Sequence, residues 1–466
     1  STDYDVSSRL YFEELTFERI ADIYDFEQPH GIIISVGGQT PNNRAKSLDA
    51  YGCNILGTTP GNIDKAEDRT KFSKLLDDLS IYQPLWNKFS TIEEVLLFCE
   101  KAGYPVLIRP SYVLSGTSMN ICNTKEELEY CLAHLDNISK EYPITVSKFI
   151  QEAKEIEFDG VAQSGTIIAS VISEHIEHAG VHSGDATIVL PTQSLSIQIQ
   201  KRLGEISAKI SKALQITGPF NIQYMIKKDD ILVIEVNLRA SRTFPFISKV
   251  TGVNFIELAV NAFFHKQKKK ITYPPIPFVA VKVAQFSFAR LLGADPFLYV
   301  EMSSTGEVAC FGDTMEEAYL KGELAVGGRI PKKGVFVSVG GDFNKLKFAS
   351  VIPYLKKLNL PVYATEKTAE LLRQHGLSAI ILHKIHEKKI PNILSHFQKE
   401  KIDLVINIPE IQLRQDVGDG YTIRREAVDR NMHLFTNIQK AQLFLKAVTS
   451  QNLDDLLVKS WDEYAD

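Results

Sequence analysis

The sequence lacks any run of apolar residues close to the ~20 that a membrane-spanning helix needs. It has only five cysteines among 466 residues, and none of them forms a Cys-x-x-Cys pair. An odd, dispersed set of this kind indicates a reducing compartment and argues against a disulfide framework or a zinc site. We therefore expect no membrane contact and a cytoplasmic location, or the mitochondrial matrix if a transit peptide has been removed.

Positive charge is not in excess either. The 52 basic residues are outnumbered by 57 acidic ones, so the net charge of -5 gives no electrostatic reason to expect nucleic-acid binding. The dense basic run HKQKKK at 265–270 precedes a proline-rich stretch and indicates a solvated linker. The chain begins with neither an initiator methionine nor a signal-peptide core, so we expect an internal piece of a longer protein.

The length and the 44% of hydrophobic residues favour two to four globular domains. Short apolar strands and Gly-rich turns between residues 31 and 60 are typical of an α/β unit, which looks truncated because no obvious strand precedes it. Two predicted hairpins, 155–177 and 220–239, flank an amphipathic helix at 197–214 and indicate an α+β domain. Five apolar strands after residue 330 alternate with helical stretches and predict a doubly wound parallel domain.

A polar row follows the strand with the sequence IEVNLR. If Gln223 of the preceding strand lies opposite Glu235, then Asn221 falls opposite Asn237, and one carboxylate and three carboxamides share a face with Arg239. A few hard oxygen ligands beside a cation suit Mg²⁺ that is bound together with a polyphosphate. The alternative is a solvated sheet face, although such faces usually carry Lys, Thr and Glu.

Two other features could serve the same phosphates. The Gly-flanked loop AGVHSGDAT at 179–187 can offer backbone N–H groups to phosphate, although its His182 could equally be an ordinary surface residue. Arg69 at a helix start and Arg109 at a strand end could each be a structural ion-pair partner. These arginines become binding residues only if they converge on the polyphosphate.

In the last domain, Thr365 and Thr368 lie at a strand-to-helix junction, where free N–H groups and the helix dipole bind anions. Lys384, Asn407 and Asn437 follow or end other strands, and in a doubly wound fold these strand tips face one crevice. Helix capping would explain one threonine but not the lysine. Because no acid/base pair or nucleophile accompanies them, we expect a binding site without chemistry.

Together, several long segments resemble the C-terminal half of the carbamoyl phosphate synthetase large subunit, nearest to the eukaryotic-style enzymes. These segments are RPSYVLSG, SEHIEHAGVHSGDAT, GPFNIQ, IEVNLRASRTFPFISK and STGEVACFG. The resemblance spans the chain. It implies a partial, Rossmann-like pre-ATP-grasp domain at 1–72, an ATP-grasp domain at 73–264, the end of the synthetase half with a linker at 265–330, and a methylglyoxal-synthase-like allosteric domain at 331–466.

The resemblance also implies roles for individual residues. Those assigned to the nucleotide are Arg69, Arg109, Lys148, Ile150, Glu155, Gly180, Val181, His182, Ser183, Gln223 and Glu235. Those assigned to two Mg²⁺ or Mn²⁺ ions are Gln223, Glu235 and Asn237. Those assigned to catalysis on carbamate are Arg239, Arg242 and His182. Those assigned to an effector are Thr365, Thr368, Lys384, Asn407 and Asn437. Three further residues match positions that, in bacterial members, connect to a monovalent ion such as K⁺ or to the allosteric ligand ornithine: His175, Glu177 and Asp185.

The implied activity is phosphorylation of carbamate by ATP during carbamoyl phosphate synthesis, for pyrimidines or for arginine and urea. It would proceed by positioning and charge neutralisation, without a covalent enzyme intermediate. The implied partners are an N-terminal synthetase half and a glutaminase domain or subunit, and a homo-oligomer is left open. The alternatives are a catalytically incomplete nucleotide-binding fragment and an ATP-grasp ligase with another acceptor.

Two departures from the family pattern bear on the effector. Lys384 stands where animal enzymes have Trp and bacterial members use Lys for an effector phosphate. It favours a phosphorylated effector, such as a uridine nucleotide or phosphoribosyl pyrophosphate, over acetylglutamate. Pro409 stands where a bacterial Thr would help to bind that phosphate, which leaves the identity of the effector open. Leu238, where bacterial members carry Pro, lies on the apolar face and should matter little.

Overall fold

The computed structural model describes residues 5–110, 119–133, 143–266, 269–298, 301–410, 418–451, 456–460 and 462–465. Residues 111–116 of the motif RPSYVLSG and residues 267–268 of the basic run lie outside these ranges. The chain divides into two compact units, which are described separately. The first comprises residues 1–83, 155–174 and 190–276, and the second comprises 84–154, 175–189 and 277–466. No helix in the described part is long and apolar enough to cross a membrane.

The first unit begins with a small α/β element in which two short parallel strands pair. Its elements are α1 Phe17–Glu27, β1 Ile32–Ile33, α2 Gln39–Asn42, α3 Ala45–Tyr51, β2 Ile55–Leu56, α4 Pro60–Glu67 and α5 Arg69–Asp78. Among residues 5–30, α1 is the one regular element, as the lack of a strand pattern predicted. Asp68 caps α5 by accepting a hydrogen bond from the backbone N–H of Lys71, which fixes Arg69 as the first residue of that helix.

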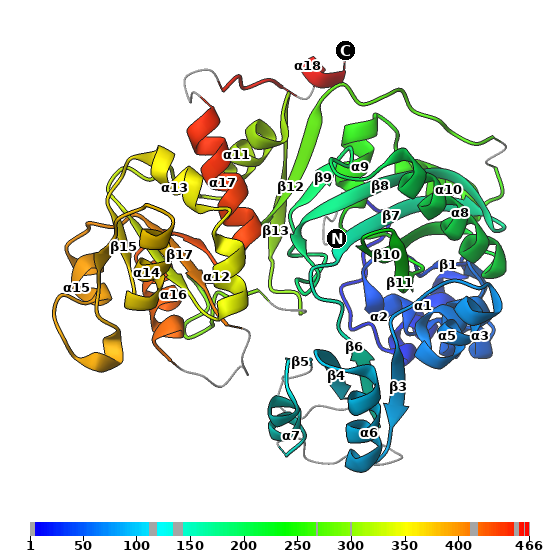
Figure 1. The fold of residues 1–466 in the computed structure, drawn as a ribbon. Coiled ribbons are helices and arrows are strands. Elements are labelled where there is room, and N and C mark those ends of the chain that lie inside the picture. Colours follow the sequence, from blue (N-terminus) through cyan, green and yellow to red (C-terminus); the bar gives the residue numbers. More distant parts are fainter. Residues whose placement is uncertain are drawn as a thin grey trace. The chain divides into compact units, whose positions relative to one another are not determined.

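The rest of the first unit is built from the two predicted hairpins and their helices, and both hairpins are confirmed. The elements are β7 Lys154–Gln163, β8 Thr166–His178, α8 Ile197–Ala213, β10 Gly218–Lys227, β11 Asp230–Asn237, α9 Phe244–Thr251 and α10 Phe255–Phe263. The short strand β9 Ile188–Leu190 belongs mostly to the second unit. The apolar stripe of α8, including Leu203 and Ile210, shares a buried cluster with Phe158 and Phe220 of the strands. Strand β8 continues from the first unit into the second (Figure 1).

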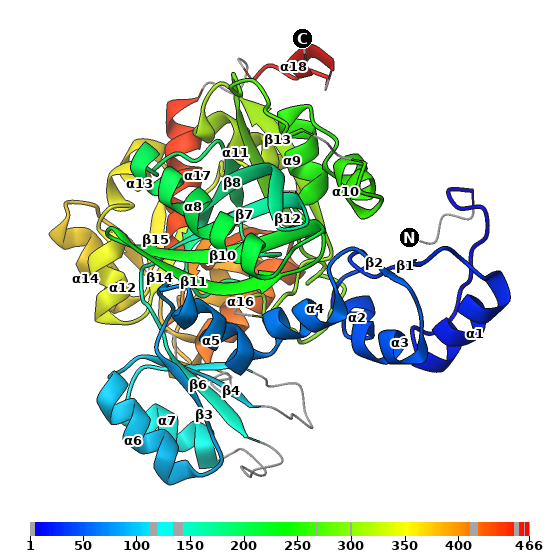
Figure 2. The same ribbon diagram turned by 90° about the vertical axis from the view of Figure 1, so that its right-hand side faces the viewer.

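The second unit contains a small four-stranded sheet with the order β3-β6-β4-β5. Its elements are β3 Trp86–Phe89, α6 Ile92–Ala102, β4 Val106–Pro110, β5 Asn120–Cys122, α7 Lys125–Ala133 and β6 Ile144–Lys148. Helices α6 and α7 cover one face of this sheet (Figure 2), because alternate residues such as Val106, Ile108 and Val146 point to both helices. The other face leaves Arg109 on β4 half-buried.

The second unit also holds the antiparallel pair β12 Val279–Gln285 and β13 Gly306–Gly312, with α11 Met315–Ala325 packed against Val281 and Val283 of β12. In the first unit, by contrast, the strand order is β11-β10-β7-β8. Helix α11 in turn contacts α17 Ile438–Ser450 (Figure 1). The short helix α18 Asp462–Ala465 follows near the end of the chain.

The five strands predicted after residue 330 form one parallel sheet, so the doubly wound domain is confirmed. The strand order is β16-β15-β14-β17-β18, and the direction of winding reverses between β14 and β17. The strands are β14 Val335–Val339, β15 Val362–Ala364, β16 Ile380–Ile381, β17 Leu404–Ile408 and β18 His433–Phe435. The other helices are α12 Asp342–Phe348, α13 Ile352–Leu358, α14 Glu366–Gln374, η1 Ile385–Glu387, α15 Ile393–Gln398 and α16 Asp419–Asp429.

Candidate nucleotide, metal and effector sites

The polar row of the hairpin β10–β11 has the register on which the predicted metal site depends. Gln223 lies opposite Glu235, and Asn221 lies opposite Asn237. Asn237 Nδ2 donates to Glu235 Oε1 at 2.9 Å, and Arg239 reaches Asn237 Oδ1 at 3.5 Å. The side chains of Gln223, Glu235 and Asn237 are half-buried, so the row is a shallow polar surface within the first unit.

A β-bulge changes the apolar side of this hairpin. Tyr224 pairs with Val233 directly after Gln223 pairs with Glu235, so Ile234 has no partner across the strands. Val233 is fully buried, whereas Ile234 is only half-buried. The Ile234 carbonyl accepts a hydrogen bond from Arg69 at 2.9 Å, so the bulge brings Arg69 to the strand that carries Glu235.

Asn221 does not share the shallow surface, because it is only 1% exposed. Its Nδ2 atom donates to Asp159 Oδ1 at 2.9 Å and to Glu157 Oε2 at 3.2 Å. Ser241 and Thr243, which follow Arg239 in the chain, donate to the same two carboxylates at 2.7 and 3.3 Å. The three carboxamides therefore share the predicted face, but only Gln223 and Asn237 are left half-buried at its surface.

Sequence reasoning missed Glu157 and Asp159, although a signal was present. The segment EIEFD places Glu155, Glu157 and Asp159 at alternate positions, which is one face of strand β7. Glu157 and Asp159 are 3% and 0% exposed. By accepting hydrogen bonds from Ser241 and Thr243 they fix the segment that carries Arg239 and Arg242.

The oxygen atoms of this surface suit a divalent cation only when a bound polyphosphate supplies further ligands. No group of three His, Cys, Asp or Glu side chains in the described ranges is placed to hold a metal ion. One carboxylate, Glu235, and the amide oxygens of Gln223 and Asn237 instead match Mg²⁺, which retains waters and phosphate oxygens. The residues present therefore fit a cation shared with a polyphosphate.

Of the other residues that the resemblance assigns to the nucleotide, Arg109, Lys148 and Ile150 lie in the second unit and Glu155 lies in the first. Lys148 Nζ donates to the carbonyls of Gly103 and Tyr104 at 3.0 and 2.8 Å, so its ammonium is anchored to the loop before β4. Arg109 Nε is buried and has no hydrogen-bond partner among the described residues. Ile150 is half-buried at the end of β6.

The loop at 179–187 is a compact turn within the second unit. The backbone N–H groups of Asp185 and Ala186 both donate to the His182 carbonyl, at 2.8 and 3.0 Å. Gly184 N–H donates to His182 Nδ1 at 3.0 Å, so a neutral His182 carries its proton on Nε2. Gly180 has a φ of +120°, and a Cβ there would lie 3.3 Å from the Phe149 ring. Val181 and Ser183 are half-buried beside these residues.

The three positions likened to a bacterial ion or ornithine site are all buried. Asp185 accepts hydrogen bonds from the backbone of Ser303 and Ser304 at 2.8 and 2.9 Å. Glu177 accepts two from Thr187. Burial raises the pKa of Glu177, against the opposing effect of Lys440. His175 is 3% exposed.

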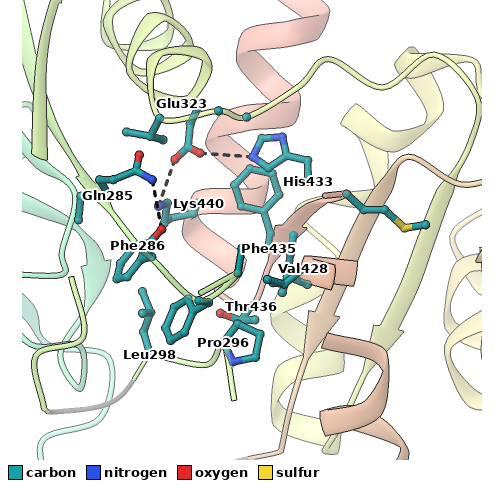
Figure 3. A pocket seen from close by; sticks show the side chains of 18 of the residues that line it. Gln285, Phe286, Pro296, Leu298, Glu323, Val428, His433, Phe435, Thr436 and Lys440 are labelled. Atoms are coloured by element: carbon teal, nitrogen blue, oxygen red, sulfur yellow. Dashed lines mark hydrogen bonds and ion pairs between the residues drawn. The ribbon is translucent and has the colours of Figure 1, made fainter. Parts of the chain in front are cut away.

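Lys440 belongs to a buried charged group at the edge of a cavity of about 310 Å³ (Figure 3). Its Nζ lies 3.1 Å from Glu323, which is also 3.3 Å from His433 Nε2. Burial would lower the pKa of Lys440, but Glu323 and Glu177 outweigh it and raise the pKa. Burial would likewise raise the pKa of Glu323, but Lys440, His433 and Tyr319 together lower it to about 2.

The structure brings only some of the predicted effector residues together. Thr368 accepts a hydrogen bond from Val339 N–H at 3.1 Å, and Asn407 pairs in register with Ser338, so both flank the carboxyl end of β14. Thr365 donates to Thr368 at 3.2 Å, and the Thr365 side chain does not cap α14. These three residues lie at the point where the winding reverses.

The other two predicted effector residues lie elsewhere in the sheet. Lys384 is exposed beyond the edge strand β16, just before η1. Asn437 follows the opposite edge strand β18, caps α17 by accepting from Lys440 N–H at 3.0 Å, and lines the cavity of Figure 3. Sequence reasoning missed Arg424 of α16, which donates to Asn407 Oδ1 at 2.8 Å.

Comparisons with known proteins agree with this architecture. Residues 68–263 match the family "Carbamoyl-phosphate synthase L chain, ATP binding domain". Residues 1–65 match "Carbamoyl phosphate synthase preATP-grasp domain", and residues 347–436 match "MGS-like domain". A solved biotin carboxylase domain of 2-oxoglutarate carboxylase from Hydrogenobacter thermophilus has a TM-score of 0.53 at 14% identity, covering 67% of this chain and 78% of that one. The fold is therefore that of the ATP-grasp class.

Two curated relatives are similar along nearly the whole chain. "Multifunctional protein URA2" of Saccharomyces cerevisiae is 46% identical over 96% of this chain and 21% of its own length. "Carbamoyl-phosphate synthase [ammonia], mitochondrial" of Mus musculus is 43% identical over 100% of this chain and 32% of its own length. The chain belongs to the carbamoyl-phosphate synthase large-subunit family and corresponds to the C-terminal half of that subunit. It spans between a fifth and a third of these relatives.

Proposed function

We propose that this chain phosphorylates carbamate with ATP to form carbamoyl phosphate, under control of its C-terminal domain. The observation that carries this proposal is the register of the hairpin β10–β11. It places Gln223 opposite Glu235, beside Asn237 and Arg239, and the bulge in the same hairpin holds Arg69. The relatives are carbamoyl-phosphate synthases, so an ATP-grasp ligase with another acceptor is not favoured.

In the proposed reaction, a carbamate oxygen attacks the γ-phosphorus of ATP in line, and ADP leaves. Mg²⁺ held by Gln223, Glu235 and Asn237 would neutralise phosphate charge, and the solved relative of the same fold was crystallised with MgADP and bicarbonate. Arg239 and Arg242 orient carbamate and balance charge on the transferred group. The specific use of Mn²⁺ or K⁺ stays a prediction.

The resemblance assigns further substrate contacts to the loop at 179–187 and to Arg109, Lys148, Ile150 and Glu155. His182 would donate from Nε2 to a phosphate oxygen, because its Nδ1 already accepts from Gly184. Backbone N–H groups of Gly180, Val181 and Ser183 would cover the triphosphate and exclude water from labile carbamate. Lys148, Ile150 and Glu155 would hold adenosine, and Arg109 a phosphate.

Several wider parts of the proposal concern the protein around this chain. An N-terminal synthetase half and a glutaminase would supply carbamate. A phosphorylated effector would bind in the crevice between β14 and β17, near Thr365, Thr368 and Asn407, with Lys384 and Asn437 contributing from the edges. The domain boundaries at 72, 264 and 330, the cytoplasmic or mitochondrial location and the oligomeric state stay predictions.

The test is ATP formation from carbamoyl phosphate and ADP by this chain, which needs neither carbamate supply nor glutaminase. We expect activity in the unmodified chain and a loss of at least about a hundredfold in Glu235→Gln, because a charged ligand of the metal–phosphate complex is removed. Asp229→Asn, at the exposed turn of the same hairpin, is the matched control and should keep full activity. Nucleotide binding without turnover in the unmodified chain would instead support the catalytically incomplete fragment.

A further inference from the structure

Arg424 joins the proposed effector crevice to a segment outside the parallel sheet. Its guanidinium is buried, with a side-chain exposure of 7%. Nε and one terminal nitrogen donate to the two oxygens of Asp295 at 2.7 and 2.5 Å, and the other terminal nitrogen donates to Asn407 Oδ1 at 2.8 Å. One side chain therefore bridges residue 407, inside the crevice, and residue 295, between β12 and β13.

The same helix holds the surrounding segment by two further side chains. Tyr421 O–H donates to the Gly293 carbonyl at 3.0 Å. Arg425 donates to the carbonyls of Ala294 and Leu291 at 3.0 and 3.3 Å. These contacts go to backbone atoms, whereas the contact of Arg424 with Asp295 is the segment's one ion pair with α16 among the described residues. An anion could therefore replace the Asp295 carboxylate as the partner of Arg424.

The chemistry favours an exchange at Arg424. A guanidinium presents a planar fork that binds a carboxylate or a phosphate in the same two-point manner. Asp295 has 29% of its side chain exposed, so a displaced carboxylate could turn to water, whereas Arg424 would stay in the crevice. A phosphate bound beside Asn407 would meet this fork directly.

The segment that carries Asp295 also forms a wall of the cavity described above. Pro296 of this segment and the nearby Leu298 line it, together with Phe286 and the buried pair of Glu323 and Lys440 (Figure 3). Loss of the Asp295 contact would therefore loosen residues 291–297, which pack beside Lys440 and Glu323. Lys440 also interacts with Glu177 of β8. Strand β8 leads into the loop at 179–187.

We propose that Arg424 is an anion-binding residue of the effector crevice, and that the phosphate of an effector replaces Asp295 as the ion-pair partner of its guanidinium. The inference rests on the proposed effector function. In the absence of effector, the pair with Asp295 holds residues 291–297 against α16. With effector bound, the arginine binds the phosphate and the segment is released.

The experiment measures binding of uridine triphosphate and of phosphoribosyl pyrophosphate to the full chain by calorimetry. Asp295→Asn removes the charge that competes for Arg424. Whichever compound binds the unmodified chain should therefore bind this variant at least about fivefold more tightly. Hydrogen exchange of residues 291–297 should rise on binding in the unmodified chain, and should already be raised in Asp295→Asn without ligand. Arg424→Lys, which loses the fork, should weaken binding.

The matched control is Asp429→Asn. It removes the carboxylate 2.7 Å from Arg425, the neighbouring arginine that does not touch Asn407, and should leave affinity unchanged. Equal affinities in Asp295→Asn and the unmodified chain would overturn the exchange while leaving the effector site in place. Binding that Lys384→Ala does not weaken, or no binding of either compound, would overturn the proposed phosphate site and the exchange with it.

Discussion

The hairpin β10–β11 and the parallel sheet β14–β18 present their polar residues in opposite ways. In the hairpin, Gln223, Glu235 and Asn237 are half-buried along a shallow surface. In the parallel sheet, Thr368 and Asn407 are 0% and 3% exposed and are bonded to Val339 N–H and to Arg424. A ligand can therefore add to the hairpin surface, whereas in the crevice it has to exchange with a protein partner.

This difference separates two kinds of polar residue. Buried groups that are bonded to the protein stabilise the fold, and removing one partner leaves the other uncompensated. Half-buried groups contribute little to stability and are available for chemistry. The changes below test this division, from the largest expected effect on stability to the smallest.

Lys440→Met should destabilise the protein most. It would leave Glu323 and Glu177 buried without their shared cation, at a cost of about 3–5 kcal/mol in the free energy of unfolding. Urea denaturation would measure this change. The control is Lys446→Met on the same helix, because the Lys446 side chain is 46% exposed. A cost below about 1 kcal/mol for Lys440→Met would contradict the structural role assigned to the pair.

Acid should reveal the same pair through the pKa of Glu323. Because that pKa is lowered to about 2 in the folded state, the charged carboxylate contributes stability above pH 4.5, and this contribution is lost as the pH falls from 4.5 towards 2. Unfolding free energies measured across this range should therefore fall more steeply in the unmodified chain than in Glu323→Gln. Parallel curves would show that the carboxylate is not paired.

Asn221→Leu tests the buried side of the hairpin. It removes the amide that donates to Glu157 and Asp159, and should cost about 1–3 kcal/mol of stability. Gln223→Leu, two residues away on the half-buried surface, should stay within about 0.5 kcal/mol and instead lower the rate of ATP formation. Similar stability losses in both variants would remove the distinction between a structural and a functional carboxamide.

The smallest effects concern two residues at helix starts in the parallel domain. Asn437 caps α17 through its side chain, so Asn437→Ala should cost about 1 kcal/mol. Thr365 does not cap α14, but it is buried and donates to Thr368, so Thr365→Ala should cost about 0.5–1.5 kcal/mol through that hydrogen bond while weakening effector binding. Thermal unfolding with and without ligand would measure both quantities. A loss of stability at Thr365 with unchanged effector binding would favour a purely structural role.

Much of the hairpin could be predicted because its information is local. The alternation of apolar and polar residues places Gln223, Glu235 and Asn237 at polar positions of their strands. The register itself depends on the bulge: counted from the two-residue turn at Lys228 and Asp229 alone, Gln223 would face Ile234, and the extra residue shifts the pairing so that Gln223 faces Glu235. The bulge could not be predicted, because the strand pattern reads equally well without the extra residue. The partners of Asn221 were also missed, since Glu157 and Asp159 reach it only after β7 pairs beside β10.

The sequence by itself determined where the strands and helices lie and which strands are parallel, because apolar periodicity and turn residues act over a few positions. Only the tertiary structure decided which charges are buried together. Arg424 meets Asp295 across 129 residues, and Lys440 meets Glu323 from another helix. The stability of a buried charge depends on the partner that packing places beside it, and a local pattern carries no information about that partner.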